Sequence, residues 1–245
     1  MLLAVDIGNS AIKFGLFEGE TLTSKFSIPT KRDTTADEIK LSVGDRLGSS
    51  IDTSIVCSVV PEIERSMRAF LRGAAHVEPV LVDNSFDFGL KINYEPLESI
   101  GTDRLVNAFA AVATYGAPCI VCSLGTATTI DVVSADREFL GGVIAPGMDA
   151  MAEALHLKAP RLPRIEIAKP ADVFGDSTPE SIRSGVYYGY VAMVEGLITR
   201  LRSASGVSRV IGTGGSSALF STELAGIMSV DADLILSGLC KLMKR

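Results

Sequence analysis

Histidine and cysteine are scarce in this sequence, which contains two and four of them among 245 residues. Neither histidine has a histidine or cysteine partner at the spacing of a metal site. The sequence also lacks a Ser-His-Asp arrangement and the G-x-S-x-G motif of a nucleophile elbow. These absences disfavour a histidine-based metal centre and a triad hydrolase.

Two of the four cysteines, Cys119 and Cys122, form a C-x-x-C pair. They lie in a run that predicts a buried strand, on which residues i and i+3 point to opposite faces. No second pair is present. We therefore interpret the cysteines as buried structural residues rather than as zinc ligands or redox groups.

Long apolar runs are missing, and none approaches the roughly 20 residues of a membrane span. The first apolar run, Met1–Val5, is too short for the core of a signal peptide and leads directly into Asp6. The net charge of −6 and the isoelectric point near 5.0 disfavour nonspecific binding of nucleic acid. We expect a cytoplasmic protein with no membrane or nucleic-acid partner.

Glycine is present in quantity, and it gathers in three turns that each follow a strand-like run. A buried strand that ends in glycine and hydroxyl residues presents backbone N–H groups to a phosphate. Three such turns predict one nucleotide held between two related halves. The turns are Asp6–Ser10, Gly125–Thr129 and Gly212–Gly215.

The order of predicted elements indicates two similar α/β domains that face a cleft. In each half a strand, a glycine turn and a returning strand precede helix and strand units. We place the domains at residues 1–112 and 113–245, although the sequence shows no close internal repeat. The segments expected to be helical are Asp37–Leu47, Glu62–Leu71, Leu105–Val112, Met148–Leu155, Pro179–Ser203 and Asp231–Lys244.

The first turn permits two interpretations. Asp6 ends a buried strand beside a glycine, with Lys13 just downstream. The turn could contact phosphate while Asp6 lies near Mg²⁺, directly or through water, because Mg²⁺ prefers oxygen ligands and retains waters. Alternatively, it is a tight hairpin whose aspartate only caps a turn. It is not a P-loop, since G-x-x-x-x-G-K-[ST] does not occur.

The segment Gly101–Arg104 also permits two interpretations. It places Asp103 and Arg104 side by side at a predicted helix start. Asp103 could be no more than a favourable helix cap. Alternatively, Asp103 is a general base beside an arginine that binds an anion.

Taken together, seven motifs resemble the type III pantothenate kinase family along nearly the whole chain. The joint pattern is specific, whereas no single motif would be. In chain order the motifs are Asp6–Lys13, Tyr94–Pro96, Gly101–Arg104, Gly125–Asp131, Gly141–Gly147, Ser184–Gly185 and Thr213–Gly215. The resemblance implies two ribonuclease-H-like domains of the actin-like, hexokinase-like ATPase superfamily, flanking a nucleotide cleft.

The resemblance further implies ATP-dependent phosphorylation of pantothenate, the first step of coenzyme A biosynthesis, with Mg²⁺ and Asp103 as the general base. It implies a homodimer with the substrate pocket near the subunit interface. The implied ATP-binding residues are Asp6, Ile7, Gly8, Asn9, Ser10, Ala11, Ile12, Lys13, Gly125, Thr126 and Gly214. The implied pantothenate-binding residues are Tyr94, Gly101, Thr102, Asp103, Arg104 and Thr178.

One residue departs from the family pattern. The second phosphate loop of the family opens with an aspartate that binds a monovalent cation, usually potassium, whereas this chain has Ser123. A neutral hydroxyl is a weaker cation ligand than a carboxylate. A K⁺ or NH₄⁺ ion is therefore expected to bind weakly or to be dispensable, since Asp6, Asp103 and Arg104 are all retained.

Two other functions compete with an active pantothenate kinase. A noncatalytic regulatory protein could keep the same fold, and Ser123 is the feature that favours it. Another small-molecule kinase of the superfamily is the second alternative, which the Tyr94 and Gly101–Arg104 pattern disfavours.

Overall fold

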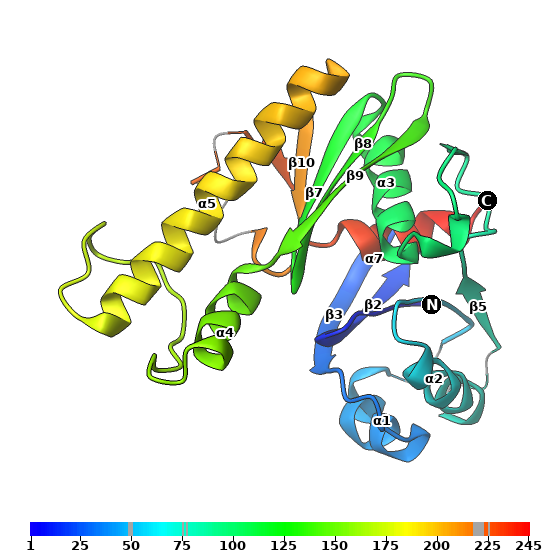
Figure 1. Ribbon diagram of the computed structural model, residues 1–245. Coiled ribbons are helices and arrows are strands. Elements are labelled where there is room, and N and C mark those ends of the chain that lie inside the picture. The colour runs from blue at the N-terminus through cyan, green and yellow to red at the C-terminus, as the bar shows by residue number, and fades with distance from the viewer. Residues whose placement is uncertain (49–50, 75, 77, 218–222, 225) are drawn as a thin grey trace. The chain divides into compact units, whose positions relative to one another are not determined.

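The computed structural model describes residues 1–48, 51–74, 76, 78–217, 223–224 and 226–245 (Figure 1). They form two compact units, one of Met1–Gly116 with Asp233–Arg245 and one of Ala117–Ala232. Each unit is a sheet with helices packed on it, so the expected α/β class is confirmed. The expected boundary after residue 112 lies four residues before the observed division. The C-terminal segment, which we assigned to the second domain, packs with the first unit.

The sheet of the first unit has the strand order β3-β2-β1-β4-β5. The strands are β1 (Leu2–Ile7), β2 (Ala11–Glu18), β3 (Thr21–Pro29), β4 (Thr53–Ser58) and β5 (Pro79–Val82). β1 is antiparallel to β2 and parallel to β4, which is itself parallel to β5. The register pairs Asp6 with Lys13 on one side and with Cys57 on the other. These three side chains therefore share one face of the sheet.

Helices cover both faces of this sheet. The first face carries Leu3, Val5 and Ile7, which pack against α1 (Ala36–Val43) and α2 (Pro61–Ala74). A capping box between Thr35 and Glu38 begins α1. The expected helix to Leu47 instead ends in the 3₁₀ turn η1 (Gly44–Arg46). The remaining short elements of this unit are β6 (Lys91–Ile92) and η2 (Leu97–Ser99).

The opposite face carries α3 (Thr102–Tyr115) and α7 (Leu234–Leu242), which lie side by side (Figure 1). They approach closely because Gly238 has no side chain: a Cβ there would stand 2.7 Å from the Cβ of Ala110. Since Asp6 belongs to this face, its carboxylate is directed toward the layer that contains α3.

The sheet of the second unit runs β11-β10-β7-β8-β9. Its strands are β7 (Cys119–Leu124), β8 (Ala127–Val133), β9 (Glu138–Pro146), β10 (Val210–Thr213) and β11 (Ser229–Val230). The helices are α4 (Met148–Lys158) and the 28-residue α5 (Thr178–Ser205), which begins at the N-cap Ser177 and ends at Gly206 in the left-handed conformation. The apolar face of α5 packs on this sheet through Val186, Tyr190, Val194 and Ile198.

All four cysteines are buried free thiols, as predicted. Burial raises the pKa of Cys119 to about 11 and that of Cys122 to about 12, so both are protonated near neutral pH. Among the described residues, no helix has both the length and the apolar character needed to cross a membrane.

Candidate active site

The turn between β1 and β2 is held by hydrogen bonds on both sides. The Gly8 N–H donates to the Ala11 carbonyl at 3.1 Å, and the Thr30 N–H donates to the Ser10 carbonyl at 3.0 Å. The Thr30 hydroxyl also donates to the Gly8 carbonyl at 2.7 Å. Asn9 and Ser10 are exposed at the tip. The result is a fixed turn with exposed polar groups, which is the form that a phosphate-binding loop requires.

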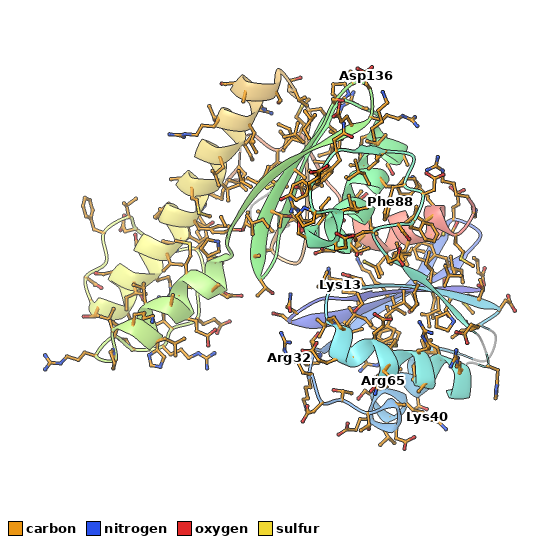
Figure 2. The ribbon with its side chains drawn as sticks, turned by 45° about the vertical axis from the view of Figure 1, so that its right-hand side comes forward. Lys13, Arg32, Lys40, Arg65, Phe88 and Asp136 are labelled. Atoms are coloured by element: carbon orange, nitrogen blue, oxygen red, sulfur yellow. The ribbon has the colours of Figure 1, made fainter. Side chains whose placement is uncertain are left out.

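The residues on either side of this turn differ in what they could offer a ligand. Ile7 and Ile12 are fully buried in the core of the first unit, so only their backbone groups could contact a ligand. Asp6, by contrast, is a buried carboxylate, 5 % exposed, whose Oδ2 lies 3.2 Å from Lys13 Nζ. Figure 2 shows Lys13 on the opposite side of the sheet from Lys40 and Arg65.

The pKa of Asp6 is raised above its ordinary value, chiefly because burial disfavours the charged form. The positive charge of Lys13 opposes this rise, and the negative charge of Asp103 adds to it. The pKa of Cys57 is also raised, by burial and by the same two carboxylates. The charge of Asp103 therefore acts on Asp6, although the two residues are 97 positions apart in the sequence.

Asp103 stands in the first turn of α3. Its Oδ1 accepts a hydrogen bond from the backbone N–H of Arg104 at 2.9 Å. Gly101 makes room for this carboxylate, because a Cβ at that position would lie 2.5 Å from Oδ1. The pKa of Asp103 is raised, first by burial, while the N–H and charge of Arg104 and the charge of Lys13 oppose the rise. A carboxylate with a raised pKa is a stronger base than an ordinary aspartate.

Arg104, the next residue, is 5 % exposed. Its guanidinium carbon lies 6.0 Å from the centre of the Tyr94 ring, which is a cation–π geometry. The structure therefore brings together two residues expected to bind pantothenate. Gly101 and Thr102 also line a cavity of about 570 Å³ in the first unit, whose lining does not include Tyr94, Asp103 or Arg104.

In the second unit, the turn between β7 and β8 exposes Gly125 and Thr126. The Gly125 N–H donates to the Ala127 carbonyl at 3.2 Å, and the Gly147 N–H donates to the Thr126 carbonyl at 3.0 Å. A Cβ at Gly147 would overlap the Gly125 carbonyl. The second turn is thus held by a glycine that follows β9.

The third turn lies against the second. Gly212 and Thr213 belong to β10, so the turn begins at Gly214 rather than at Gly212. Gly214 has a φ of +95°, and a Cβ there would stand 2.5 Å from the Leu124 carbonyl oxygen. Only glycine fits this combination of conformation and close approach.

Ser123 occupies β7 in register with Thr129 of β8 and Thr213 of β10. Neighbours in register point to the same side of a sheet, so three hydroxyl side chains form a row there. Thr178 is exposed at the first residue of α5. It belongs to the second unit, whereas the other residues expected to bind pantothenate belong to the first.

Three polar side chains that support the proposed site lie outside the seven motifs. Thr30 holds the first turn, Asn84 hydrogen-bonds to Thr102, and the Tyr190 hydroxyl lies 2.6 Å from the Thr128 hydroxyl beside the second turn. The only sequence signal for Asn84 is its place just after a strand. Within the part of the chain that the structure describes, no group of three histidine, cysteine, aspartate or glutamate residues could hold a metal by itself. The carboxylate of Asp6, the residue expected near Mg²⁺, offers the oxygen ligands that a magnesium ion prefers alongside waters and phosphate oxygens.

The type III pantothenate kinase family model matches residues 2–200. Similar proteins described by that name include one from Halalkalibacterium halodurans, 39 % identical over 100 % of this chain and 99 % of its own. A second, from Shouchella clausii, is 40 % identical over 98 % of this chain and 97 % of its own. A third, from Paramagnetospirillum magneticum, is 40 % identical over 100 % and 97 %.

Solved structures with the same fold are more distant in sequence. A Campylobacter jejuni protein described as a conserved Baf family transcriptional activator is 21 % identical, with a TM-score of 0.60 over 99 % of this chain and 97 % of its own. A ROK family glucokinase from Streptomyces griseus, solved with glucose and AMPPNP, is 14 % identical, with a TM-score of 0.55 over 98 % of each chain. These likenesses confirm the two-domain actin-like ATPase fold.

Proposed function

Because the chain belongs to the type III pantothenate kinase family, we propose that it transfers the γ-phosphoryl group of ATP to the primary hydroxyl of pantothenate. The products are 4′-phosphopantothenate and ADP, and the reaction is the first step of coenzyme A biosynthesis. The observation that supports this proposal at the level of residues is the cluster of Asp6, Lys13 and Asp103 in the first unit. We place the enzyme in the cytoplasm.

Asp103 is proposed as the general base. The pantothenate hydroxyl oxygen forms a bond to the γ-phosphorus as the bond from that phosphorus to the β,γ-bridging oxygen breaks, and the hydroxyl proton passes to Asp103. The raised pKa of Asp103 favours this acceptance, because burial destabilises its charged form. Tyr94, Arg104 and the backbone at Gly101 and Thr102 would hold the substrate.

The first turn, from Asp6 to Lys13, is proposed to bind the phosphates of ATP. Its exposed tip offers backbone N–H groups, and Lys13 supplies a positive charge beside Asp6. Asp6 would hold Mg²⁺, directly or through water. When bound, this ion neutralises the charge that develops on the transferred phosphoryl group. Gly125, Thr126 and Gly214, which belong to the second unit, would also contact the nucleotide.

A homodimer and a contribution of Thr178 to the pantothenate pocket are part of the same proposal. Supporting evidence comes from the segment that precedes α5, where Val173 and Phe174 are 62 % and 91 % exposed. Large exposed apolar side chains of this kind mark protein–protein contacts. Thr178 lies four residues after Phe174 in the sequence.

Ser123 bears on the monovalent cation. A row of three neutral hydroxyls stands where the family places a carboxylate, and hydroxyls attract a cation more weakly. We therefore propose that K⁺ or NH₄⁺ binds weakly or is dispensable for turnover.

The two alternative functions have less support. The likeness to the Campylobacter jejuni protein is below 25 % identity and concerns the fold alone. The ROK kinase likeness is equally distant. The match to full-length pantothenate kinases at 40 % identity is therefore stronger evidence of function than either structural likeness.

A substrate panel tests the proposal. Purified protein is incubated with ATP and Mg²⁺ and with pantothenate, glucose or N-acetylmannosamine, and ADP release is measured. We expect release with pantothenate alone. Release with a sugar instead would assign another kinase activity, and a folded, ATP-binding protein without any release would favour the regulator.

A further inference from the structure

The side-chain amide of Asn84 forms three hydrogen bonds, and all three partners lie in one short segment of the chain. Asn84 lies two residues after β5. Its Nδ2 donates to the carbonyls of Leu97 and Ile100, each at 2.8 Å, and its Oδ1 accepts from the Thr102 hydroxyl at 2.6 Å. Both amide protons and the amide oxygen are therefore engaged.

The segment that Asn84 holds is the approach to Asp103. Its three partners span η2, the N-cap residue Gly101 and the first residue of α3. Gly101 supplies no side-chain cap to α3. A helix start without a cap depends on other contacts to fix it. Asn84 supplies such contacts from the turn that follows β5.

The position of Asp103 is sensitive to this segment. Its Oδ1 fills the space left by the missing side chain of Gly101, so a displacement of residues 100–102 also displaces the carboxylate. Catalysis tolerates such displacement poorly, since an error of about 1 Å in a reacting group can cost roughly 10²-fold in rate.

Asn84 also connects two parts of the proposed site. β1, β4 and β5 are parallel, so the residues that follow them emerge at one edge of the sheet. Asp6 is the next-to-last residue of β1, and Asn84 follows β5 at the same end of these parallel strands. The hydrogen bonds of Asn84 therefore connect the end of the sheet near Asp6 to α3, the helix that carries Asp103.

We propose that Asn84 is a positioning residue for the phosphoryl transfer: through Leu97, Ile100 and Thr102 it fixes Asp103 at the hydroxyl that Asp103 deprotonates. The hydroxyl of Thr102 serves the same function, since it donates to Asn84. This inference rests on the proposed pantothenate kinase activity.

The test compares Asn84→Ala and Thr102→Val with the wild-type enzyme in steady-state assays with pantothenate. Each variant removes hydrogen bonds of the Asn84 side chain. We expect kcat to fall by roughly 10- to 100-fold, following the cost of misplacement, with the KM for ATP unchanged. The acidic limb of the pH profile should move to lower pH, because a displaced Asp103 is better solvated. Thr102→Ser retains the hydroxyl and should keep a higher kcat than Thr102→Val.

Ser99→Ala is the matched control. The Ser99 hydroxyl donates to the Pro96 carbonyl at 2.7 Å within the same segment, so Ser99→Ala removes a hydrogen bond that is not one of the three made by Asn84. We expect wild-type kcat from it. The double variant of Asn84 and Thr102 should lose no more kcat than Asn84→Ala alone, because the bond that Thr102→Val removes is one of the three that Asn84→Ala already removes.

The proposal would be overturned by folded Asn84→Ala or Thr102→Val protein with a kcat within twofold of wild type. It would also be overturned if Ser99→Ala lost as much activity. A wild-type enzyme without turnover would instead contradict the proposed function. In that case, amide hydrogen exchange tests the Asn84 contacts directly. Asn84→Ala should lose protection against exchange at residues 97–104 and keep it at residues 21–29. Unchanged protection at residues 97–104 would refute the proposal.

Discussion

At the scale of single residues, Gly101 shows how an absent side chain can serve catalysis. A Cβ there would meet Asp103 Oδ1, the free end of a movable side chain, and not a backbone atom. Gly101→Ala should therefore displace the carboxylate while the fold remains intact. We expect kcat to fall about 10²-fold with a nearly unchanged melting temperature. Gly73→Ala, where the space is open, is the control and should keep full activity. A large loss of thermal stability in Gly101→Ala would contradict this account.

The charge of Lys13 controls the pH dependence of the proposed base. Lys13 lowers the pKa of both Asp6 and Asp103, which burial raises. Without the lysine charge, both pKa values should rise further. Since Asp103 acts in its deprotonated form, the acidic limb of kcat/KM should move to higher pH in Lys13→Met. Lys13→Arg keeps the charge and should leave the limb in place. A limb that stays put in Lys13→Met, or moves to lower pH, would rule out this coupling.

Ser123 provides a test of the cation proposal. Ser123→Asp introduces a carboxylate between Thr129 and Thr213, in the row of hydroxyls. We expect the wild-type enzyme to turn over similarly in sodium and potassium buffers and the variant to be stimulated by potassium. Ser123→Ala serves as the control, with no gain of stimulation. Strict potassium dependence of the wild type would show that other oxygens hold the ion.

At the scale of elements, the first phosphate turn depends on the residue that follows β3. The Thr30 hydroxyl donates to the Gly8 carbonyl, and a bond of this kind contributes about 1 kcal/mol. Thr30→Val should therefore raise the KM for ATP roughly fivefold, with a smaller effect on pantothenate. Thr23→Val is the matched control, because Thr23 makes the same kind of bond from β3 to the Leu16 carbonyl, away from the turn. Equal effects of the two variants would assign Thr30 to general stability.

The elements around each turn were predictable because their causes are local. Apolar runs of strand length, followed by glycine and hydroxyl residues, predicted β1, β7 and β10 with their turns. Boundaries were less accurate: β7 extends through Ser123 and Leu124, and α5 is longer than expected at both ends. Strand pairing decides the end of β7, and it depends on contacts that no local pattern records. The N-cap Ser177 decides the start of α5 through a local contact to the Glu180 N–H.

The supporting residues of the site could not be predicted for a related reason. Thr30 and Asn84 act on residues 22 and 18 positions away, and these contacts exist only after the sheet has formed. Asp103 and Arg104 were found because they are adjacent in the sequence. The influence of the Asp103 charge on the pKa of Asp6 follows from the face that β1 directs toward α3, which depends on strand register.

At the scale of the whole molecule, the C-terminal segment departs from the expected linear division into domains. The helix itself was predicted, but its packing partner was not. α7 packs with α3 in the first unit, where Gly238 faces Ala110. The first unit is therefore made of both ends of the chain, and the second is a continuous insertion between them.

The measurement that tests the central claim most directly is transfer of the γ-phosphoryl group of ATP to pantothenate by the wild-type protein and by Asp103→Asn, side by side. The account predicts that the wild type forms one 4′-phosphopantothenate for each ADP. It predicts that the variant folds, binds ATP and turns over roughly 10²- to 10⁴-fold more slowly, the usual range for loss of a general base. Folded wild-type protein that binds ATP without phosphorylating pantothenate, or near-normal turnover by Asp103→Asn, would contradict it.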